Sequence, residues 1–304
     1  MTTLIKNGTI VTATDTYKAD ILVKNGLVSE IGREIDKIAS EIIDAADKWI
    51  LPGAVDVHTH LDSNCDGMTT VDDFETATAA AAAGGTTMVV DHADQAPGAT
   101  LAATLEEWKA KAGPRAVIDY GFHLSLSEVS ESVLAEIPAL VEAGVTSFKI
   151  SLDGAGERRI GDAAILEFLQ RVGAAGALPV VHAENGEIID FLIRRLGAEG
   201  KTSARYLPAS RPPEVEGEAT GRVITLAELG RTPLFLAGLS SAHAAEKVKA
   251  ARDRGQVVYA ETCPQYLVLA SDRYEEPEGI KYYATPPLRP AWHQEVLWRA
   301  MASG

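Results

Sequence analysis

Two histidines one residue apart end a short apolar segment, Gly53-Ala54-Val55-Asp56-Val57-His58-Thr59-His60. In a strand, side chains at positions i and i+2 project from the same face, so a strand that ends here directs both imidazoles toward one point. Two neutral nitrogens that converge in this way suit a divalent metal ion. The alternative is a pair of solvated histidines in a turn, and this segment alone does not decide between the two.

A lysine and a third histidine occupy comparable places further along the chain. Lys149 is flanked by apolar residues in the segment 147–151. A desolvated lysine has a lowered pKa and becomes nucleophilic, as reaction with carbon dioxide requires, and the resulting carbamate can bridge two metal ions. The alternative is a lysine that pairs with a carboxylate or extends to solvent. His182 follows the next apolar run, where the alternative to a ligand is a hydrogen-bonded core histidine.

The segments around these residues predict an α/β fold. From residue 53 onward, short apolar runs alternate with helical segments, which is typical of parallel strands joined by helices. Polar residues recur at the C-terminal ends of the runs, where a (β/α)8 TIM-type barrel carries its chemistry. We therefore expect such a barrel without its eighth strand, and an open doubly wound sheet is the alternative. The expected strands are 53–57, 86–90, 117–122, 146–150, 178–181, 233–239 and 257–261.

The first 52 residues predict a separate, small β-sandwich-like domain. Asn7-Gly8 and Asn25-Gly26 favour tight hairpin turns, because both residue types tolerate positive φ. The expected domains are thus a β-domain at 1–52 and a barrel domain at 53–304 that is incomplete at its C-terminal end. The expected strands of the first domain are 4–6, 9–11, 21–24, 27–31 and 49–51. In the barrel domain, helices are expected at 71–83, 101–112, 129–143, 162–175, 242–253 and 290–301. A capping box of Thr70 and Asp73 is expected to begin the helix at 71–83.

Composition narrows the class of protein. The 304 residues include 43 acidic and 28 basic side chains, and the net charge of −15 argues against a nucleic-acid or anionic-membrane partner. The two cysteines, Cys65 and Cys263, predict neither a disulfide framework nor a zinc ribbon. Without a signal-peptide core or a run of about 18 apolar residues, the chain is expected to be cytoplasmic.

Several short motifs, in order along the chain, resemble those of the cyclic amidohydrolases of the dihydropyrimidinase and D-hydantoinase type, with allantoinase and dihydroorotase as relatives. The resemblance implies a metal-dependent barrel that opens a dihydropyrimidine or hydantoin ring by attack of a metal-bound hydroxide. It also implies a small cyclic amide or ureide substrate and a homo-oligomer, either a dimer or a tetramer. The motifs are Lys6-Asn7-Gly8, Leu51-Pro52-Gly53, His58-Thr59-His60-Leu61-Asp62, Gly84-Gly85-Thr86-Thr87, Phe148-Lys149, His182-Ala183-Glu184-Asn185, Glu261-Thr262-Cys263-Pro264-Gln265-Tyr266-Leu267 and Pro286-Pro287-Leu288-Arg289.

The resemblance also implies a set of site residues. By position, His58 and His60 hold one metal ion, Lys149 as its carbamate bridges, and His182 holds the second ion. The expected cofactors are two divalent ions, zinc or alternatively manganese, and the carbon dioxide that carboxylates the lysine. Thr285 stands where relatives have a serine whose main chain holds the substrate.

The sequence departs from this pattern at three places. Gly238 stands where the family has a histidine after the sixth strand, which weakens the second metal site and allows fewer than two ions, and His243 is not expected to replace it. Gly154 replaces a tyrosine that contacts the substrate ring. The aspartate that serves as general base belongs to an eighth strand, so it is expected to be absent from this chain.

These departures leave an alternative function open. A non-catalytic scaffold or binding protein of the same fold accommodates them. Under either function the chain is expected to be a fragment or a natural short form, and low or no turnover is expected from it. His92 and His123 are expected to be buried, hydrogen-bonded side chains rather than ligands, and Cys263 a packed residue.

Overall fold

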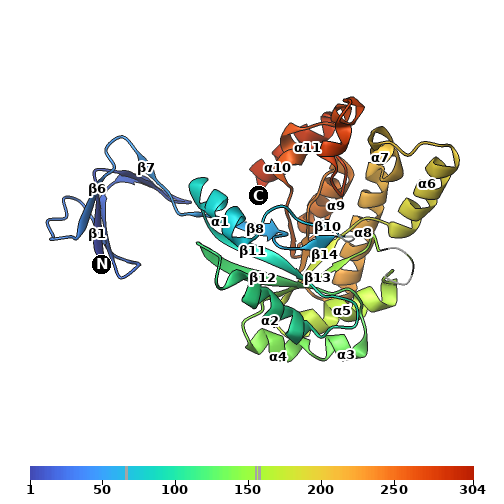
Figure 1. The fold of residues 1–304 in the computed structure, drawn as a ribbon, viewed down its shortest axis with the longest axis horizontal. Helices are drawn as coiled ribbons and strands as arrows, with labels where there is room; N and C mark the ends of the chain where they lie inside the picture. The colour runs from blue at the N-terminus through green and yellow to red at the C-terminus, as the bar shows by residue number, and fades with distance from the viewer. Residues whose placement is uncertain (66–67, 155, 157–158) are drawn as a thin grey trace. The chain divides into compact units, whose positions relative to one another are not determined.

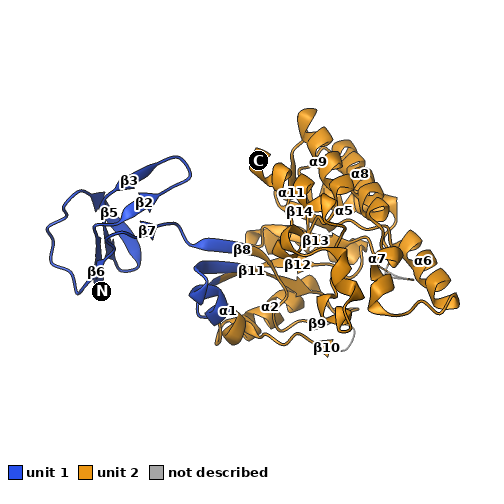
Figure 2. Cartoon of the chain, turned by 90° about the horizontal axis from the view of Figure 1, so that it is seen from above, with its two compact units in different colours: residues 1–56, 78–89, 117–119 blue, residues 57–77, 90–116, 120–304 orange. Residues whose placement is uncertain are grey.

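A computed structural model describes residues 1–65, 68–154, 156 and 159–304. The chain divides into two compact units (Figure 2). The first comprises residues 1–56, 78–89 and 117–119, and the second comprises residues 57–77, 90–116 and 120–304. Every histidine and the lysine considered above belong to the second unit.

The N-terminal residues form two small sheets. One sheet has the order β5-β4-β1-β6 and the other the order β3-β2-β7. Separate apolar clusters line them, one around Leu4 and Leu22 and one around Ile10 and Ile21. The strands are β1 (Thr2–Lys6), β2 (Thr9–Val11), β3 (Thr16–Lys18), β4 (Asp20–Lys24), β5 (Leu27–Gly32), β6 (Glu41–Asp44) and β7 (Trp49–Ile50).

The two Asn-Gly pairs have different roles. Asn25-Gly26 joins the antiparallel strands β4 and β5, with φ of 51° and 79°, as a tight hairpin requires. The hairpin predicted at Asn7-Gly8 is wrong, because it links β1 to β2 of the other sheet. Asn7 still takes φ of 65°. A Cβ on Gly8 would lie 2.3 Å from Ile50 Cδ1, so only glycine lets the chain pass this close to Ile50 as it moves from one sheet to the other.

Seven strands form the large sheet, and their spatial order follows the sequence: β8, β11, β12, β13, β14, β15, β16. Neighbours from β12 to β16 pair in parallel, and the sheet is curled (Figure 1). This order lacks the reversal of a doubly wound sheet, so the barrel-type prediction is confirmed over its alternative. The strands are β8 (Ala54–Thr59), β11 (Thr86–Asp94), β12 (Asp119–Ser125), β13 (Ser147–Ser151), β14 (Leu178–His182), β15 (Leu234–Leu236) and β16 (Val258–Ala260).

Helices cover one face of this sheet (Figure 1). Their apolar side chains form one core with strand residues such as Phe148 and Ile150. A short hairpin, β9 (Asn64–Cys65) and β10 (Met68–Thr69), follows β8. The helices are α1 (Phe74–Ala83), α2 (Leu101–Ala112), α3 (Glu131–Leu134), α4 (Ile137–Glu142), α5 (Asp162–Ala174), α6 (Gly186–Ala198), α7 (Leu207–Ser210), α8 (Pro213–Gly230), α9 (Ala242–Asp253), α10 (Pro264–Val268) and α11 (Trp292–Ser303), with 3-10 turns at Ala204–Tyr206, Ser271–Glu275 and Gly279–Tyr282.

Two of the expected helices differ from the structure. The capping box predicted at Thr70 lies three residues later, because Asp73 Oδ1 accepts from Thr76 N at 2.8 Å while Thr76 Oγ1 accepts from Asp73 N at 3.2 Å. The single helix expected over 129–143 is two helices, α3 and α4, with Pro138 in the first turn of α4.

The strand register determines which side chains face away from the helices. Phe148 and Ile150 point into the helix-covered core, so Lys149, between them, points to the opposite face. Ser125 is aligned with Lys149, and Ser151 is aligned with His182, so β12, β13 and β14 present one shared face. The sheet therefore places His123, Lys149 and His182 on its helix-free face.

Two further predictions concerned membrane-spanning segments and disulfides. Among the helices in the described part of the chain, none is both long and apolar enough to cross a bilayer. The expectation of no disulfide involves Cys65, whose side chain lies outside what the structure describes.

Candidate metal centre

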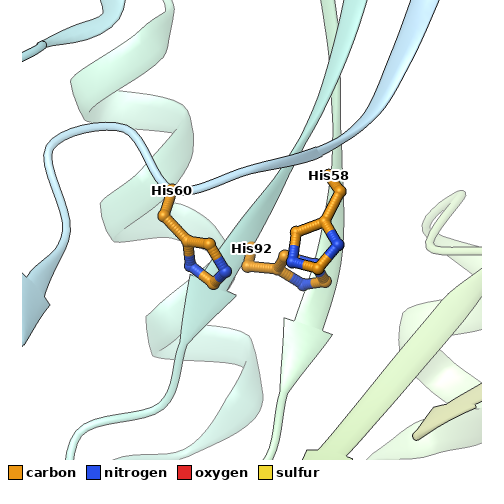
Figure 3. Close-up of side chains that lie close together, drawn as sticks. All are labelled: His58, His60 and His92. Atoms are coloured by element: carbon orange, nitrogen blue, oxygen red, sulfur yellow. The ribbon is translucent and has the colours of Figure 1, made fainter. Parts of the chain in front are cut away.

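Three histidines meet at the carboxyl end of the sheet. His58 ends β8, His60 follows it, and His92 lies near the end of β11. One nitrogen from each lies within 4.8 Å of the others, and the His92 ring centroid is 4.7 Å from those of both His58 and His60. Figure 3 shows the three imidazoles gathered around one space. The predicted convergence of His58 and His60 is thus present, and His92 joins them.

Asp91 fixes the backbone that carries the His-x-His pair. Its Oδ1 accepts from Thr59 Oγ1 at 2.7 Å and from Leu61 N at 2.8 Å, and its Oδ2 accepts from Trp108 Nε1 at 3.1 Å. Burial raises the pKa of Asp91 to about 6, although these three donors oppose the rise. Asp91 therefore positions the segment between the histidines and does not face the metal centre itself.

Carboxylates orient the first two histidines. His58 Nδ1 is paired with Glu261, and because a carboxylate only accepts, Nδ1 carries the proton and Nε2 is the nitrogen that can bind a metal ion. Burial lowers the pKa of His58, opposed in part by that hydrogen bond. His60 Nδ1 lies 3.8 Å from Asp94 Oδ2, which also accepts from Ser63 at 2.9 Å.

Lys149 adjoins this cluster. Its side chain is buried, and Nζ lies 3.3 Å from His92 Nε2. Burial lowers the pKa of Lys149, and the charges of Asp94 and Glu261 oppose this only in part. The positive charge of Lys149 acts to lower the pKa of both His92 and His182.

His92 and His123 differ in how their nitrogens are satisfied. His92 is only 1% exposed, and its Nδ1 has no hydrogen-bond partner in the part of the chain that the structure covers. Burial, and then the charge of Lys149, holds the pKa of His92 well below its usual range. His123 Nε2 donates to the Val57 carbonyl oxygen at 2.9 Å, so its Nδ1 accepts from the Ser147 hydroxyl. The expected hydrogen bonding is confirmed for His123 but is incomplete for His92.

His182 belongs to a second cluster. Its Nε2 lies 3.0 Å from Glu184 Oε2 and 4.0 Å from Asp153 Oδ2, and the three residues are grouped closely enough to hold an ion. Arg211 contacts Glu184 at 2.6 Å and Asp153 at 3.0 Å. Burial lowers the pKa of His182, but the Glu184 hydrogen bond and the Asp153 charge outweigh this and raise it overall. His182 is therefore held by carboxylates, separately from the three-histidine cluster.

Gly238 lies directly beside His58. A Cβ at this position would be 3.8 Å from His58 Cε1 and 4.0 Å from Cys263 Sγ, so the space for a side chain exists although the φ of +66° favours glycine. His243 lies in α9, where its ring packs 5.9 Å from His293 and 6.2 Å from Trp292. His243 thus belongs to a different part of the fold, as expected.

A buried ion pair holds the loop that follows Gly238. Glu216 and Arg289 are almost fully buried and lie 3.0 Å apart. Glu216 also accepts from Ser240 N at 2.8 Å and Ser241 N at 3.3 Å, and Arg289 Nε donates to Ser240 Oγ at 2.8 Å. Because every one of these groups has a partner, the network fixes the loop beside His58.

Two positions predicted from the resemblance, Thr285 and Gly154, lie outside the three-histidine cluster. Thr285 is exposed, and no hydrogen bond joins it to the histidines or Lys149 within the described ranges. Gly154 directly follows Asp153 of the second cluster, so a side chain there would start next to the candidate site.

Comparisons with known proteins identify the family of this chain. A profile described as the amidohydrolase family matches residues 49–295. The chain belongs to this family. It is 48% identical over its whole length to the D-hydantoinase of Geobacillus stearothermophilus, of which it spans 65%. Among solved structures, it superimposes with a TM-score of 0.97 on a D-hydantoinase at 46% identity and on the dihydropyrimidinase of Brevibacillus agri at 44%, covering 100% of this chain and 67% of each structure.

The sequence analysis missed His92 as a member of the cluster, and it gave no role to Asp94 or Asp153. A signal was present, because His92 and Asp94 alternate in β11 just as His58 and His60 alternate at the end of β8. Both pairs lie at the carboxyl end of a barrel strand, where side chains from successive strands converge.

Proposed function

We propose that this chain carries the metal-binding domain of an enzyme that hydrolyses the C–N bond of a cyclic amide, of the dihydropyrimidinase or hydantoinase type. One observation carries the proposal: imidazoles from two strands converge beside a buried lysine at the carboxyl end of a barrel sheet. The similarity to D-hydantoinases along the whole chain supports it. We keep the division into a β-domain at 1–52 and a barrel domain at 53–304 as part of the proposal.

The donor set fits a divalent metal ion. We propose His58, His60, carboxylated Lys149 and His182 as ligands, with zinc as the ion and manganese as the alternative. Imidazole nitrogens and an anionic oxygen donor suit these ions, and the Nδ1 of His92, which has no hydrogen-bond partner in the described part of the chain, supports a metal ion here. When bound, such an ion polarises a carbonyl and lowers the pKa of water.

The environment of Lys149 favours carboxylation. A neutral amine attacks carbon dioxide, forms an N–C bond and releases one proton, so a lysine whose pKa is lowered by burial presents more of the reactive form. The carbamate carries a negative charge, where the protonated lysine carries a positive one. It therefore removes the repulsion between the Lys149 ammonium and a bound cation.

The chain's own residues provide orientation around this site. Glu261 fixes the tautomer of His58, and Asp91 fixes the backbone between His58 and His60. Arg211 neutralises the carboxylates that hold His182.

We propose Thr285 as a substrate contact by position. We also propose a cytoplasmic homo-oligomer, a dimer or a tetramer, whose mass light scattering measures.

Metal analysis combined with intact mass measurement tests the proposal. Purified native chain should contain bound zinc or manganese and carry the added mass of one carbon dioxide, both of which are lost in Lys149→Met. Ring opening of hydantoin or dihydrouracil is then followed by absorbance with metal and bicarbonate present. Absence of both metal and added mass would favour the non-catalytic scaffold, which the glycine at position 238 already allows.

A further inference from the structure

We propose that His92 is a direct ligand of the metal ion held by His58 and His60, so that three imidazoles bind this ion. The inference rests on the proposed function, because it concerns the same ion. The candidate donor atoms of the three residues lie within 4.8 Å of one another. Figure 3 shows the His92 ring beside those of His58 and His60, and its centroid is 4.7 Å from each.

The hydrogen bonding of His92 supports a ligand role. A buried nitrogen without a partner is rare in folded proteins. His92 is 1% exposed, and its Nδ1 has no partner among the residues whose structure is known here. A metal ion bound between the three rings would supply a partner within this cluster.

The contact with Lys149 limits the tautomer. If the lysine donates to His92 Nε2, the imidazole proton sits on Nδ1 and leaves a buried N–H without an acceptor. If Lys149 is neutral, Nε2–H donates to Nζ at 3.3 Å and Nδ1 keeps a lone pair. The second arrangement leaves a lone pair on Nδ1, so it is the one in which His92 can bind a metal ion through that nitrogen.

His92 reaches the His-x-His pair from the neighbouring strand β11, with its ring edge-on to His58 at 79° and stacked on His60 at 27°. Imidazole nitrogens are ligands that zinc prefers in proteins, and the carbamate oxygen of Lys149 would be a further donor to the same ion.

His123 provides a matched control. Its ring stacks on His92 with centroids 4.8 Å apart, and it occupies the same helix-free face of the sheet. Both of its nitrogens have protein partners, Ser147 Oγ and the Val57 carbonyl. His123 therefore shares the neighbourhood and the residue type of His92 without its unpartnered nitrogen.

Competition with a chromophoric chelator measures the zinc affinity of four chains: the native chain, His92→Asn, His123→Asn and His58→Asn. Circular dichroism checks that each variant folds. We expect zinc binding to weaken by at least about 100-fold in His92→Asn and His58→Asn. His123→Asn should retain the native affinity. Native affinity in His92→Asn together with loss in His58→Asn would overturn the role of His92 while leaving the proposed metal centre intact.

Two further outcomes distinguish failure of the His92 proposal from failure of the proposed metal centre. Native affinity in both His58→Asn and His92→Asn would contradict the metal centre of the proposed function itself. If His92→Asn fails to fold, X-ray absorption of the native chain loaded with one equivalent of zinc counts the imidazoles around the ion. Three imidazoles would support the proposal, and two would overturn it.

Discussion

His293 makes the stability of this fold depend on pH. The residue lies in the first turn of α11, is 1% exposed, and accepts a hydrogen bond through Nδ1 from Ala242 N at 2.9 Å, at the start of α9. Burial, followed by the charges of Arg289 and His243, lowers the pKa of His293 to about 4. An imidazole that accepts at Nδ1 carries its proton on Nε2, so a second proton could bind only at Nδ1 and would break the bond from Ala242 N.

The size of the effect follows from linkage. Because the folded-state pKa is below the unfolded value of about 6.5, the unfolded chain takes up a proton first as the pH falls. At pH 5, which is about 1.5 pH units below 6.5, this costs about 2 kcal/mol of stability relative to pH 7.5, at about 1.4 kcal/mol per unit. The loss begins near pH 6.5 and levels off near the folded pKa of about 4.

The perturbation that isolates this effect is His293→Asn, which keeps a side-chain acceptor for Ala242 N and removes the titration. Urea unfolding at pH 7.5 and pH 5 gives the free energy of unfolding for both chains. We expect the native chain to lose about 2 kcal/mol more than the variant between these pH values. His293→Phe removes the acceptor as well, so it should be less stable at both pH values but share the shallow pH dependence. Equal pH dependence in the native chain and His293→Asn would refute the reasoning.

Three further predictions concern the core and the metal centre. Glu216→Gln should cost about 3–5 kcal/mol in urea unfolding because Arg289 loses its buried partner, and an unchanged midpoint would contradict this. Phe168→Ala should cost about 3–5 kcal/mol by opening a cavity in the main core, measured in the same way. Chelation should lower the melting temperature of the native chain but not that of His58→Asn, and equal shifts in calorimetry would indicate an ion bound elsewhere.

The sequence predicted the barrel strands well because their apolar runs are short and are separated by helical segments. It did not predict α6 and α8. Gly217 and Gly221 interrupt the helical pattern of α8, yet a Cβ on Gly217 would lie 2.7 Å from His243 Cβ. Close packing against α9 therefore selects glycine where helix propensity alone argues against a helix.

The candidate site was predictable where its residues are neighbours in sequence. His58 and His60 share one strand end, so their convergence follows from the strand period. The contacts of His92 with Lys149, and of Glu261 with His58, join residues 57 and 203 positions apart. Such contacts depend on the register and curvature of the whole sheet, which the local pattern does not contain.

The most direct test of the central claim is a crystal structure of the native chain grown with zinc, with anomalous scattering recorded at the zinc edge. The account predicts a peak about 2.0–2.1 Å from nitrogens of His58 and His60, together with carboxylate density on Lys149 Nζ. Data that show an unmodified Lys149 and place no zinc among these side chains would contradict it.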